Sequence, residues 1–497
     1  MSNIIGIDLG TTYSAVAVID EVGIPKLIEN QSKTRRDNLI PSVVTITKDG
    51  EVEVGESPRR SLELDENTVG RWKRDMGKSK KFKLQGKNYT PTNLSSFVLS
   101  EIKDIAEKNY GKVDQAVVTI PANFSSNARE ATLEAASKAG LNVERIINEP
   151  TAAALYCAYV EGSDFNGKYA VFDLGGGTFD ISIIKVKGKD IEVLGSDGIH
   201  ELGGQDFDII LQQIVSEKFK KKTKKALEKE DYTVTNAEED KKILSTDTEI
   251  MIRVMGKTIK IERNEFEEAI SSKVVQAEMK CESLMDELKL SSKDIVGVIL
   301  AGGSTRIPCV QECVKRIFRQ DPISIANPDE MVALGAALHA AYTSDESLLN
   351  AAQQHTVKNI NIQERTADYY GTIVAAQSTD GREYTLEVSN IIHRGEKIPV
   401  SVTKEYRTLY EGQTVVNCRI TESKTNEKDP QWVFLKWEGQ LDLPPNCPTG
   451  DLIKVTYSYD ENQVMNCSFV HDSSGRKTEI ALNISTVDDD VEKFTVD

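Results

Sequence analysis

Two stretches of the sequence combine residue types that could hold a chain of phosphates. Residues 5–19 read IGIDLGTTYSAVAVI and residues 171–184 read VFDLGGGTFDISII, so both have an apolar strand, Asp-Leu-Gly, small residues with a threonine, and a second apolar strand. Glycines let backbone N–H groups turn toward an anion without a β-carbon in the way, and threonine hydroxyls add donors. The repetition predicts two related hairpins that face each other across one polyphosphate. The residues concerned are Gly10, Thr11, Thr12, Gly175, Gly176, Gly177 and Thr178.

Three aspartates in these stretches indicate a metal ion. Asp8, Asp173 and Asp180 would repel phosphates if nothing lay between them. They make chemical sense beside a divalent cation, and Mg²⁺ commonly meets carboxylates and phosphates through the waters that it keeps. The alternative is a pair of tight hairpins without a ligand, but their matched design favours a shared ligand.

A third glycine loop, Gly302-Gly303-Ser304-Thr305-Arg306, leaves the apolar stretch Ile295–Leu300. We expect it to reach the same ligand from the opposite side. The familiar phosphate-binding fingerprints are absent, because there is no Walker loop of the form GxxxxGK[ST] and no GxGxxG in a suitable strand–helix context.

One predicted helix carries a polar stripe. Asn236 with Glu239 three residues later fits a helix cap and capping box. The stripe itself occupies positions i, i+3, i+4 and i+7, which by pattern alone favours a solvated face. Its residues are Glu238, Lys241, Lys242 and Ser245.

The elements that must position these loops alternate between strand and helix patterns along residues 1–345. Ile4–Ile7 and Ala15–Ile19 are typical of buried strands on either side of a turn. Ser126–Ala139 is rich in alanine with helical apolar spacing, and Gly140 stands where a helix C-cap is expected. This alternation predicts an α/β architecture with ligand loops at strand ends.

The character of the chain changes near residue 350. Residues 351–366 (AAQQHTVKNINIQERT) are polar, without glycine or proline, and are interpreted as a linker or a frayed helix end. The strand patterns that follow predict an antiparallel β sandwich. The predicted strands are 398–402, 415–420, 433–437, 453–459, 464–470 and 480–484. The predicted organisation is therefore an α/β domain with the phosphate loops at 1–350, a linker at 351–366, a β-sandwich domain at 367–487 and an acidic tail at 488–497.

Composition excludes several classes of protein. The 497 residues include 61 basic and 78 acidic side chains, for a net charge of −17, which disfavours broad nucleic-acid binding. No run approaches the roughly 20 apolar residues that span a bilayer, and the N-terminus does not resemble a secretory signal. Seven cysteines without a CxxC pair favour free thiols over a disulfide framework or zinc ribbon. We expect a cytoplasmic protein without nucleic-acid or membrane partners.

A series of motifs identifies a family resemblance. IGIDLGTTYSAVAV, VTIPANFSSNARE, RIINEPTAAAL, VFDLGGGTFDISI, GGQDFD, VILAGGSTRIP and NPDEMVALGAA occur in order. Together they resemble the ATPase domain of the seventy-kilodalton heat-shock chaperones of the DnaK type. GEKIPVSVT and LDLPPNCPTGDLIKVTYSYDENQVMNCSF resemble, more faintly, the β-sandwich peptide-binding domain of that family.

The resemblance implies an actin-like ATPase domain, with two lobes on a duplicated ribonuclease-H-like core, followed by an all-β sandwich. It implies that ATP or ADP binds at the base of the cleft. Mg²⁺ and K⁺ are the implied ions, organised mostly through water by Asp8, Asp173 and Asp180. The implied catalytic residues are Asp8, Lys73 (in NTVGRWKRDMG), Glu149 (in INEP), Asp173 and Thr178.

The remaining site residues follow from the same resemblance. Phosphate contacts fall on Gly10, Thr11, Thr12, Tyr13, Gly175, Gly176 and Gly177, and Gly203 and Gly204 line the cleft. The polar stripe Glu238, Lys241, Lys242 and Ser245 matches the adenosine-contacting helix, with Lys242 where an arginine is usual. Gly302, Gly303, Ser304, Arg306 and Asp329 would hold the base and ribose.

The implied function is an ATP-dependent chaperone that binds unfolded peptide clients and hydrolyses ATP slowly. A J-domain co-chaperone and a nucleotide-exchange factor are the implied partners. Two alternatives remain open. One is a non-hydrolysing ATP-binding regulator or exchange partner of another chaperone, and the other is an actin-like kinase.

Two departures from the family pattern carry expectations of their own. The family linker is filled with leucines, whereas Asn359–Glu364 offers only Ile360 and Ile362, which could still add a strand edge. The sequence alone therefore does not predict coupling between ATP state and peptide release. Only 12 residues follow Ser485, too few for the helical lid of the family. We expect a lidless chaperone with fast peptide exchange.

Overall fold

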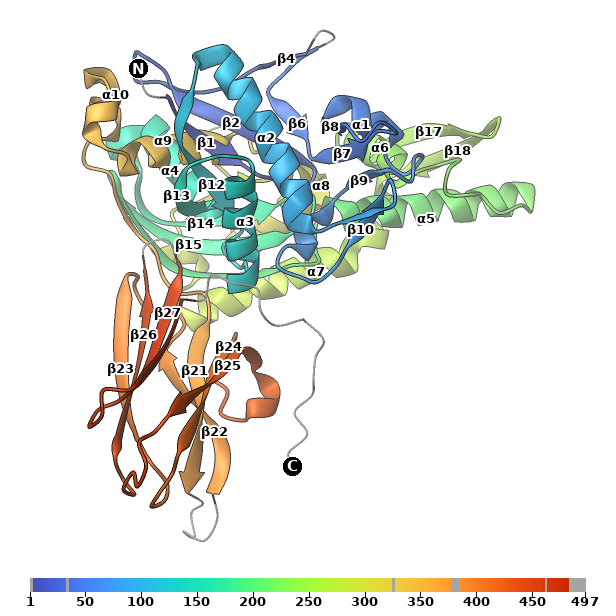
Figure 1. Cartoon of the computed structure of the whole chain (residues 1–497). Coiled ribbons are helices and arrows are strands. Elements are labelled where there is room, and N and C mark those ends of the chain that lie inside the picture. Colours follow the sequence, from blue (N-terminus) through green and yellow to red (C-terminus); the bar gives the residue numbers. More distant parts are fainter. Residues whose placement is uncertain (1–2, 33–34, 324–326, 378–383, 461–462, 482–497) are drawn as a thin grey trace. The chain divides into compact units, whose positions relative to one another are not determined.

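The computed structural model describes residues 3–32, 35–323, 327–377, 384–460 and 463–481. The chain divides into two compact units, Met1–Ile362 and Gln363–Asp497, which we call unit 1 and unit 2. Figure 1 labels many of their elements. Among the described residues, no helix is both long and apolar enough to cross a bilayer.

The first large sheet of unit 1 carries the first predicted hairpin. Its order is β13-β12-β1-β2-β3, with β6 also paired to β2. The antiparallel pair β1–β2 is the hairpin, and β12 runs parallel to β1. The strands are β1 (Asn3–Asp8), β2 (Tyr13–Ile19), β3 (Pro25–Leu27), β6 (Leu39–Pro41), β12 (Val113–Ile120) and β13 (Val143–Asn148).

The second large sheet repeats this plan. Its order is β19-β14-β15-β16-β20, with β14–β15 as an antiparallel hairpin and β19 parallel to β14. The predicted repeat of two hairpins is therefore confirmed. In each hairpin the first strand pairs with the second strand on one side and with a parallel strand on the other. The strands are β14 (Asn166–Leu174), β15 (Phe179–Lys187), β16 (Asp190–Ile199), β19 (Gly297–Ala301) and β20 (Asn361–Gln363).

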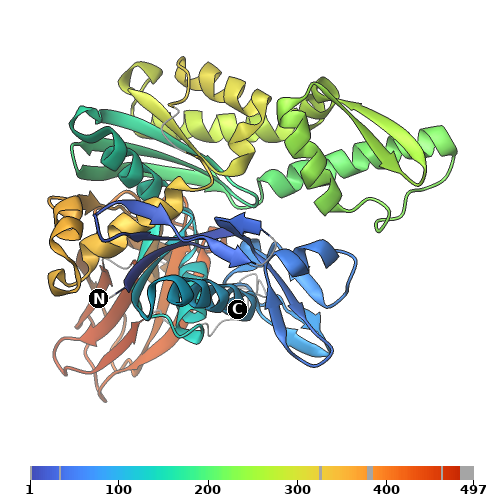
Figure 2. The same ribbon diagram turned by 90° about the horizontal axis from the view of Figure 1, so that it is seen from above.

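Two helices join these sheets through one apolar core. α4 (Glu149–Glu161) and α9 (Met331–Thr343) share a cluster of buried residues with strands of both sheets. The packing is close, because a β-carbon on Gly335 of α9 would lie 1.8 Å from the carbonyl oxygen of Ala152 in α4. Similarly, a β-carbon on Gly6 of β1 would lie 2.0 Å from the backbone nitrogen of Ala337. Figure 2 shows α9 beside β1. Glycine at these positions therefore lets the backbones meet.

Further elements surround the sheets of unit 1. The helices are α1 (Glu56–Ser61), α2 (Pro91–Tyr110), α3 (Ser126–Lys138), α5 (Gly204–Thr223), α6 (Val234–Thr246), α7 (Arg263–Glu287), α8 (Pro308–Phe318) and α10 (Ala351–Val357). The short strands are β4 (Asn30–Ser32), β5 (Arg35–Asp37), β7 (Val43–Ile46), β8 (Val52–Val54), β9 (Thr68–Gly70), β10 (Phe82–Leu84), β11 (Lys87–Tyr89), β17 (Glu249–Val254) and β18 (Lys257–Glu262). The 3-10 helices include η1 (Trp72–Asp75) and η4 (Gly303–Arg306).

The predicted cap of α6 is wrong. The helix begins one turn earlier than expected, with Thr233 as its N-cap and Asn236 as the partner that completes the capping box. The Thr233 hydroxyl oxygen accepts the backbone N–H of Asn236 at 3.1 Å. Glu239 instead accepts a hydrogen bond from Arg59. Thr233 and Asn236 form the cap in place of the predicted pair Asn236 and Glu239, because both of their side chains bond to backbone N–H groups at the start of the helix.

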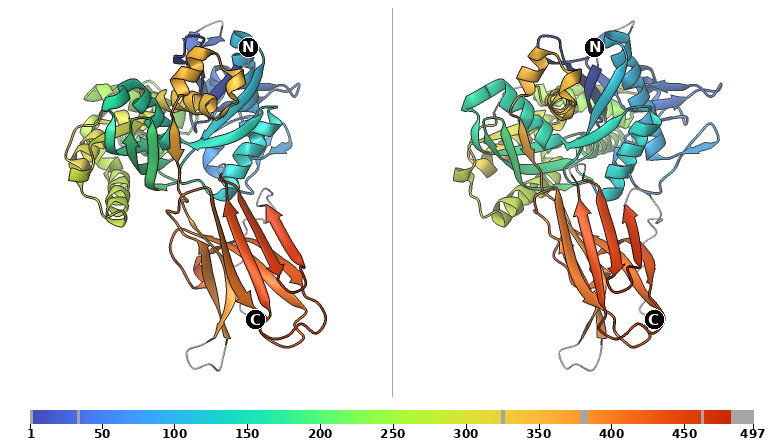
Figure 3. Two further views of the ribbon diagram at one scale, coloured as in Figure 1. Left: turned by 90° about the vertical axis from the view of Figure 1, so that its left-hand side faces the viewer. Right: turned by 60° about the vertical axis from the view of Figure 1, so that its left-hand side comes forward.

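Unit 2 consists of two four-stranded antiparallel sheets with one shared core. Their orders are β22-β21-β24-β25 and β23-β26-β27-β28. Figure 3 shows these strands in orange and red. The alternation predicted for 453–459 is confirmed, because Ile453, Val455, Tyr457 and Tyr459 of β26 are buried. The strands are β21 (Tyr369–Gln377), β22 (Tyr384–Ile392), β23 (Val400–Arg407), β24 (Val415–Ser423), β25 (Phe434–Asp442), β26 (Leu452–Tyr459), β27 (Met465–His471) and β28 (Lys477–Ala481).

Residues 351–366, interpreted from sequence as a linker, contain regular structure. They form α10 and β20, and the division between the units falls inside β20. The backbone N–H of Asn361 donates to the carbonyl of Lys189 at 3.1 Å, and Ile360 is buried. The expected strand edge therefore forms as the last strand of the second sheet. The predicted acidic tail 488–497, and the end of the predicted strand 480–484, lie outside the described residues.

Candidate functional site

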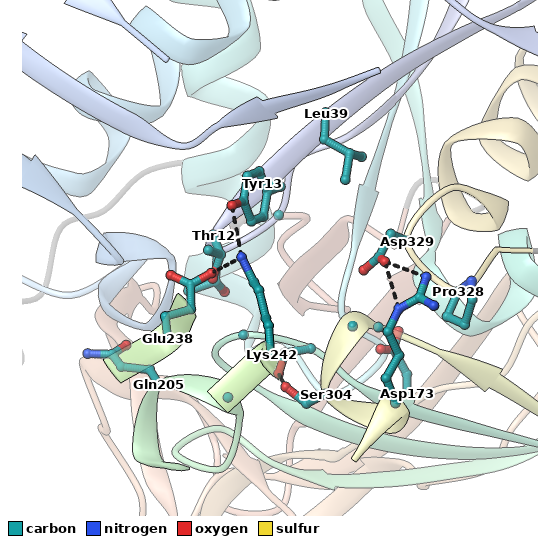
Figure 4. Close-up of a pocket in the computed structure, with 18 of the residues that line it drawn as sticks. Thr12, Tyr13, Leu39, Asp173, Gln205, Glu238, Lys242, Ser304, Pro328 and Asp329 are labelled. Atoms are coloured by element: carbon teal, nitrogen blue, oxygen red, sulfur yellow. Dashed lines mark hydrogen bonds and ion pairs between the residues drawn. The ribbon is translucent and has the colours of Figure 1, made fainter. Parts of the chain in front are cut away.

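The glycine loops of unit 1 surround one cavity of about 700 Å³. Figure 4 shows part of its lining. It brings together side chains that are far apart in the sequence. The predicted site residues that line it are Asp8, Gly10, Thr11, Thr12, Tyr13, Lys73, Glu149, Asp173, Gly175, Gly176, Thr178, Gly204, Glu238, Lys241, Lys242, Ser245, Gly302, Gly303, Ser304, Arg306 and Asp329. Three predicted residues, Gly177, Asp180 and Gly203, are not part of the lining.

The two hairpin loops pack against each other at one end of the cavity. A β-carbon on Gly176 would lie 2.1 Å from the hydroxyl oxygen of Thr12, and one on Gly177 would lie 2.4 Å from that of Thr11. Gly203 packs behind them, because its β-carbon would lie 2.7 Å from the backbone of Gly176 and Gly177. Gly177 and Gly203 therefore support the loops from behind rather than facing the cavity.

The third loop lies beside the second hairpin rather than opposite it. The Ser304 hydroxyl donates to the carbonyl of Gly175 at 2.9 Å. Gly302 has a φ of +78°, and its β-carbon would lie 2.5 Å from the carbonyl oxygen of Leu174. The reason is topological, because β14 and β19 are parallel neighbours whose carboxyl ends meet at one edge of the sheet.

A buried ion pair lines the acidic part of the cavity. Lys73, from η1, lies with its Nζ 2.6 Å from Oε1 of Glu149, the first residue of α4. Burial alone would lower the pKa of Lys73, but the carboxylates of Glu149 and Asp8 outweigh it and raise the pKa. The ammonium is therefore charged and aimed at the acidic groups.

The surroundings of two aspartates in this region disfavour their charged form and raise their pKa values. Burial, and then the charge of Glu149, raise the pKa of Asp8 to about 7, although Lys73 acts in the other direction. Burial, followed by the charges of Glu149 and Asp180, raises the pKa of Asp173 well above its ordinary value. Burial is thus the main cause of both shifts, and the neighbouring carboxylates add to it.

Asp180 stands behind this group. It pairs with Asp173 across the β14–β15 ladder, is buried, and accepts the backbone N–H of Asn123 at 3.1 Å. The four carboxylates Asp8, Glu149, Asp173 and Asp180 thus outnumber the Lys73 ammonium that faces them. Oxygen donors in excess of positive charge are the set that a hard divalent cation such as Mg²⁺ prefers, so the residues fit that ion.

The polar stripe of α6 is partly buried, which overturns its interpretation as a solvated face. Glu238 and Lys241 are 4% and 7% exposed. Lys241 Nζ lies 2.6 Å from Oδ1 of Asp208, while Lys242 Nζ lies 3.0 Å from Oε1 of Glu238 and 3.2 Å from the Tyr13 hydroxyl. Figure 4 shows the last two contacts. The stripe faces the cavity because it finds charged partners there.

A further ion pair borders the third loop. Arg306 Nη2 lies 2.9 Å from Oδ2 of Asp329. A β-carbon on Gly303 would lie 2.7 Å from Oδ1 of the same aspartate. The flat guanidinium, the carboxylate and the bare glycine backbone together form a narrow polar wall suited to a planar, hydrogen-bonding ligand.

Sequence reasoning missed two contributors to the site. Arg59 of α1 contacts Glu238 at 3.2 Å, and its guanidinium carbon lies 5.0 Å from the centroid of the Tyr13 ring. Its sequence context contains no signal for this role. Asp208, whose pKa burial raises to about 6 against the charge of Lys241, ends the recognised motif GGQDFD and could have been found there.

The cavity thus combines bare backbone donors, an excess of carboxylates and a buried lysine, which suits a magnesium-bound polyphosphate. A family profile described as Hsp70 protein matches residues 4–85 and 78–497. The match therefore includes both glycine hairpins, the third loop and the strands of unit 2. This chain belongs to the Hsp70 family.

Proposed function

We propose that this protein is an ATP-dependent molecular chaperone, in which unit 1 binds and slowly hydrolyses ATP and unit 2 binds unfolded or extended peptide segments. Membership of the Hsp70 family supports a chaperone-type function in general. The observation that carries the finer proposal is the buried Lys73–Glu149 pair beside Asp8 and Asp173, in a cavity edged by three glycine loops.

An actin-like, two-lobed core is part of the proposal. Its support is the repetition in topology, because each large sheet contains an antiparallel hairpin whose first strand has a parallel neighbour. Two copies of one supersecondary unit, with the Asp-Leu-Gly segments at equivalent places, are what a duplicated core predicts. The shared core around α4 and α9 fits the same view.

In this proposal the phosphates lie against the hairpin loops. The backbone of Gly176 and the hydroxyls of Thr11, Thr12 and Thr178 are the proposed donors. The N–H groups of Gly10 and Gly175 already donate within their own loops, so these two glycines contribute by leaving space for the phosphates. Mg²⁺, when bound on the side of Asp8 and Asp173 with Asp180 behind, supplies the charge neutralisation that phosphoryl transfer requires. The protein itself need not form a covalent bond, since positioning and electrostatics dominate this chemistry.

Lys73 and Glu149 have complementary roles in hydrolysis. The Lys73 ammonium offers a fixed positive charge to the terminal phosphate, where negative charge accumulates in the transition state. Glu149 keeps that ammonium in place, and its carboxylate is a hydrogen-bond acceptor for an attacking water. Retention of both groups favours hydrolysis over the alternative of a non-hydrolysing regulator.

The adenosine is proposed to lie between α6 and the third loop. Glu238, Lys241, Lys242 and Ser245 line one side of the cavity, and Gly302, Gly303, Ser304, Arg306 and Asp329 line the other. Tyr13 closes the region, since its hydroxyl lies 3.2 Å from Lys242 Nζ. With the adenosine in this place, the part of the cavity lined by Asp8, Glu149 and Asp173 is left for the metal ion and the phosphates that it binds.

Peptide binding by unit 2 is supported by its exposed apolar side chains. Tyr384 and Leu386 of β22 are 58% and 46% exposed, and Trp432 and Phe434 are 70% and 69% exposed. Large exposed apolar groups often mark surfaces that bind partners. Unfolded clients are the proposed ligands, and a J-domain co-chaperone and a nucleotide-exchange factor are the proposed regulators.

The deciding experiment measures peptide exchange together with ATP turnover. A fluorescent apolar peptide is released from the full chain in the presence of ATP and of ADP, and phosphate release is followed in a single turnover. We expect phosphate to form and the peptide to leave faster with ATP. Absence of phosphate formation, together with faster nucleotide release from a partner chaperone, would favour the regulator instead.

A further inference from the structure

Three side chains of unit 2 converge at a place unrelated to the cavity of unit 1. Cys447 comes from the connection between β25 and β26, Asp451 directly precedes β26, and His471 ends β27. Their sulfur, oxygen and nitrogen atoms all lie within 4.8 Å of one another. Cys447 and His471 are almost fully buried, with 1% and 0% of their surfaces exposed. Such a mixed, buried set calls for an explanation.

The distances within the set match the coordination shell of a small divalent ion. Cys447 Sγ lies 3.5 Å from His471 Nε2, which lies 2.9 Å from Asp451 Oδ2. Cys447 Sγ lies 3.9 Å from the same Asp451 oxygen. Zinc bonds of about 2.3 Å to sulfur and about 2.0 Å to nitrogen and oxygen place tetrahedral ligands about 3.3–3.6 Å apart. Shifts of a few tenths of an ångström would thus suffice.

The Nε2 atom of His471 has more polar neighbours than one ring nitrogen can hydrogen-bond. Nε2 of His471 has three polar neighbours, because the Ser473 hydroxyl also lies 3.2 Å away. One ring nitrogen carries either one proton or one lone pair, so it cannot serve all three. The other nitrogen, Nδ1, lies 2.7 Å from the Ser474 hydroxyl. Metal-bound histidines use their second nitrogen for such an orienting hydrogen bond.

A nucleophilic Cys–His–Asp relay does not fit the geometry. In such a relay the nucleophile and the orienting carboxylate use different nitrogens of the ring. Here Cys447 and Asp451 both approach Nε2 of His471. The thiol is also buried, which denies a substrate access to it. Convergence on a common point is instead the arrangement of ligands around an ion.

The backbone fixes the positions of these ligands. The carbonyl of Cys447 accepts the N–H of Gly412 at 2.8 Å, and the N–H of Asp451 donates to the Thr408 hydroxyl at 2.9 Å. The second carboxylate oxygen of Asp451, Oδ1, accepts the N–H of Leu452 at 2.9 Å. Oδ2 therefore remains the oxygen that faces the sulfur and the nitrogen, and it also accepts the Ser473 hydroxyl at 2.7 Å.

We propose that Cys447, Asp451 and His471 form a binding site for one zinc-type divalent ion. Thiolate, imidazole and carboxylate are its preferred ligands, and the thiolate and carboxylate charges balance the ion. Ser473 or a water completes a tetrahedral shell. The ion ties the loop before β26 to the end of β27, so its binding free energy stabilises unit 2.

The test uses Co²⁺ as a spectroscopic probe of the full chain after removal of bound metal with a chelator. We expect one Co²⁺ per chain to produce a sulfur-to-cobalt charge-transfer band, and one Zn²⁺ to displace it. The acidic cavity of unit 1 offers oxygen and nitrogen but no sulfur, so Co²⁺ bound there produces no such band. Absence of the band in the wild-type chain overturns the proposal.

Two variants locate the ligand. In Cys447→Ala the band should disappear and Zn²⁺ should no longer raise the unfolding temperature of unit 2. The control is Cys467→Ala, which truncates another buried cysteine in the same unit and should keep both responses. If Cys447→Ala does not fold, His471→Gln keeps the thiol and should bind Zn²⁺ at least about 100-fold more weakly. An unchanged band in Cys447→Ala, or unchanged affinity in His471→Gln, overturns the proposal.

Discussion

Gly176 lies so close to Thr12 that a β-carbon on the glycine would be 2.1 Å from the threonine hydroxyl oxygen. The two residues belong to different hairpins, so this approach sets the distance between the two hairpin loops. An alanine at position 176 would require the Thr12 hydroxyl to rotate away. The new β-carbon would also lie 3.2 Å from Thr12 Cβ, so the threonine side chain has little space into which it could move.

The first prediction follows from that contact. Gly176→Ala should weaken binding of magnesium ADP by about 10-fold or more, because one donor to a charged ligand contributes roughly 1.5–3 kcal/mol. Equilibrium titration of the full chain measures the effect. In a Thr12→Ala background the same glycine substitution should cost much less, because the displaced hydroxyl is already gone. Equal costs in both backgrounds would show that the contact does not position the threonine.

The second prediction concerns the buried lysine. Lys73→Ala should slow single-turnover hydrolysis on the order of 100-fold or more while changing ATP affinity far less, because its charge acts mainly on the transition state. Lys78→Ala, which removes a half-exposed lysine of the same segment, is the matched control and should hydrolyse ATP normally. Equal turnover in wild type and Lys73→Ala would remove the lysine from the catalytic group.

The third prediction concerns nucleotide release. Arg59 of α1 contacts Glu238 and Glu239 of α6, at 3.2 Å and 2.7 Å, and α6 lines the cavity. Truncating one partner of a buried charge pair typically costs about 2–5 kcal/mol. Arg59→Ala should therefore release fluorescent ADP at least about 10-fold faster, as measured by displacement.

The neighbouring arginine supplies the control for this measurement. Arg60 is exposed, and its guanidinium lies 3.9 Å from Glu56 on the same helix rather than on α6. Arg60→Ala should leave the release rate close to that of wild type. If both variants release ADP at the same rate, the contact between α1 and α6 does not retain the nucleotide.

The fourth prediction is a pH dependence of stability from His339 in α9. Burial, and then the charge of Arg145, lower the pKa of His339 to about 3. An unfolded histidine titrates near pH 6.5, so between these values only the unfolded chain takes up the proton. The free energy of unfolding therefore falls as pH falls through this window, by about 2 kcal/mol between pH 7 and pH 5.

His339→Leu isolates this contribution. Denaturant unfolding of both proteins at pH 7 and pH 5 should show that the variant loses about 2 kcal/mol less than wild type on acidification. The comparison between two pH values cancels the effect of the substitution on packing. The same loss in both proteins would mean that His339 is charged in the folded state.

Much of the fold of unit 1 could be predicted from sequence because its signals are local. The strands around Asp8 and Asp173 are continuous apolar runs that end in Asp-Leu-Gly, and they form β1 and β14. Burial and turn chemistry within a few residues determine such elements. The alternation of buried and partly exposed residues in β26 could be predicted for the same reason.

Features that depend on distant partners were not predictable in this way. The stripe of Glu238 and Lys241 has the pattern of a solvated face, but Arg59 and Asp208 neutralise it inside the cavity. Residues 351–366 are polar and were interpreted as a linker, yet Asn361 pairs with the free edge beyond β16. A sheet edge elsewhere in the chain, rather than local sequence, determines whether such a segment becomes a strand.

The set of Cys447, Asp451 and His471 shows the same limit. Cys447 and Asp451 are four residues apart and His471 follows 20 residues later, which is not a familiar metal-binding spacing. Pairing of Ile453 with His471 in the β26–β27 ladder brings them together. Register between strands therefore creates a cluster that residue spacing does not reveal.

In the proposed function, the glycine hairpins and the acidic group of unit 1 hold a magnesium nucleotide. Calorimetric titration of the full chain with ATP, with Mg²⁺ and then with excess chelator, tests it most directly. We predict one binding site per chain, with affinity at least about 10-fold weaker without the ion, since the carboxylates then face the phosphates unscreened. Absence of binding with Mg²⁺ present, or equal affinity with and without it, would contradict the claim.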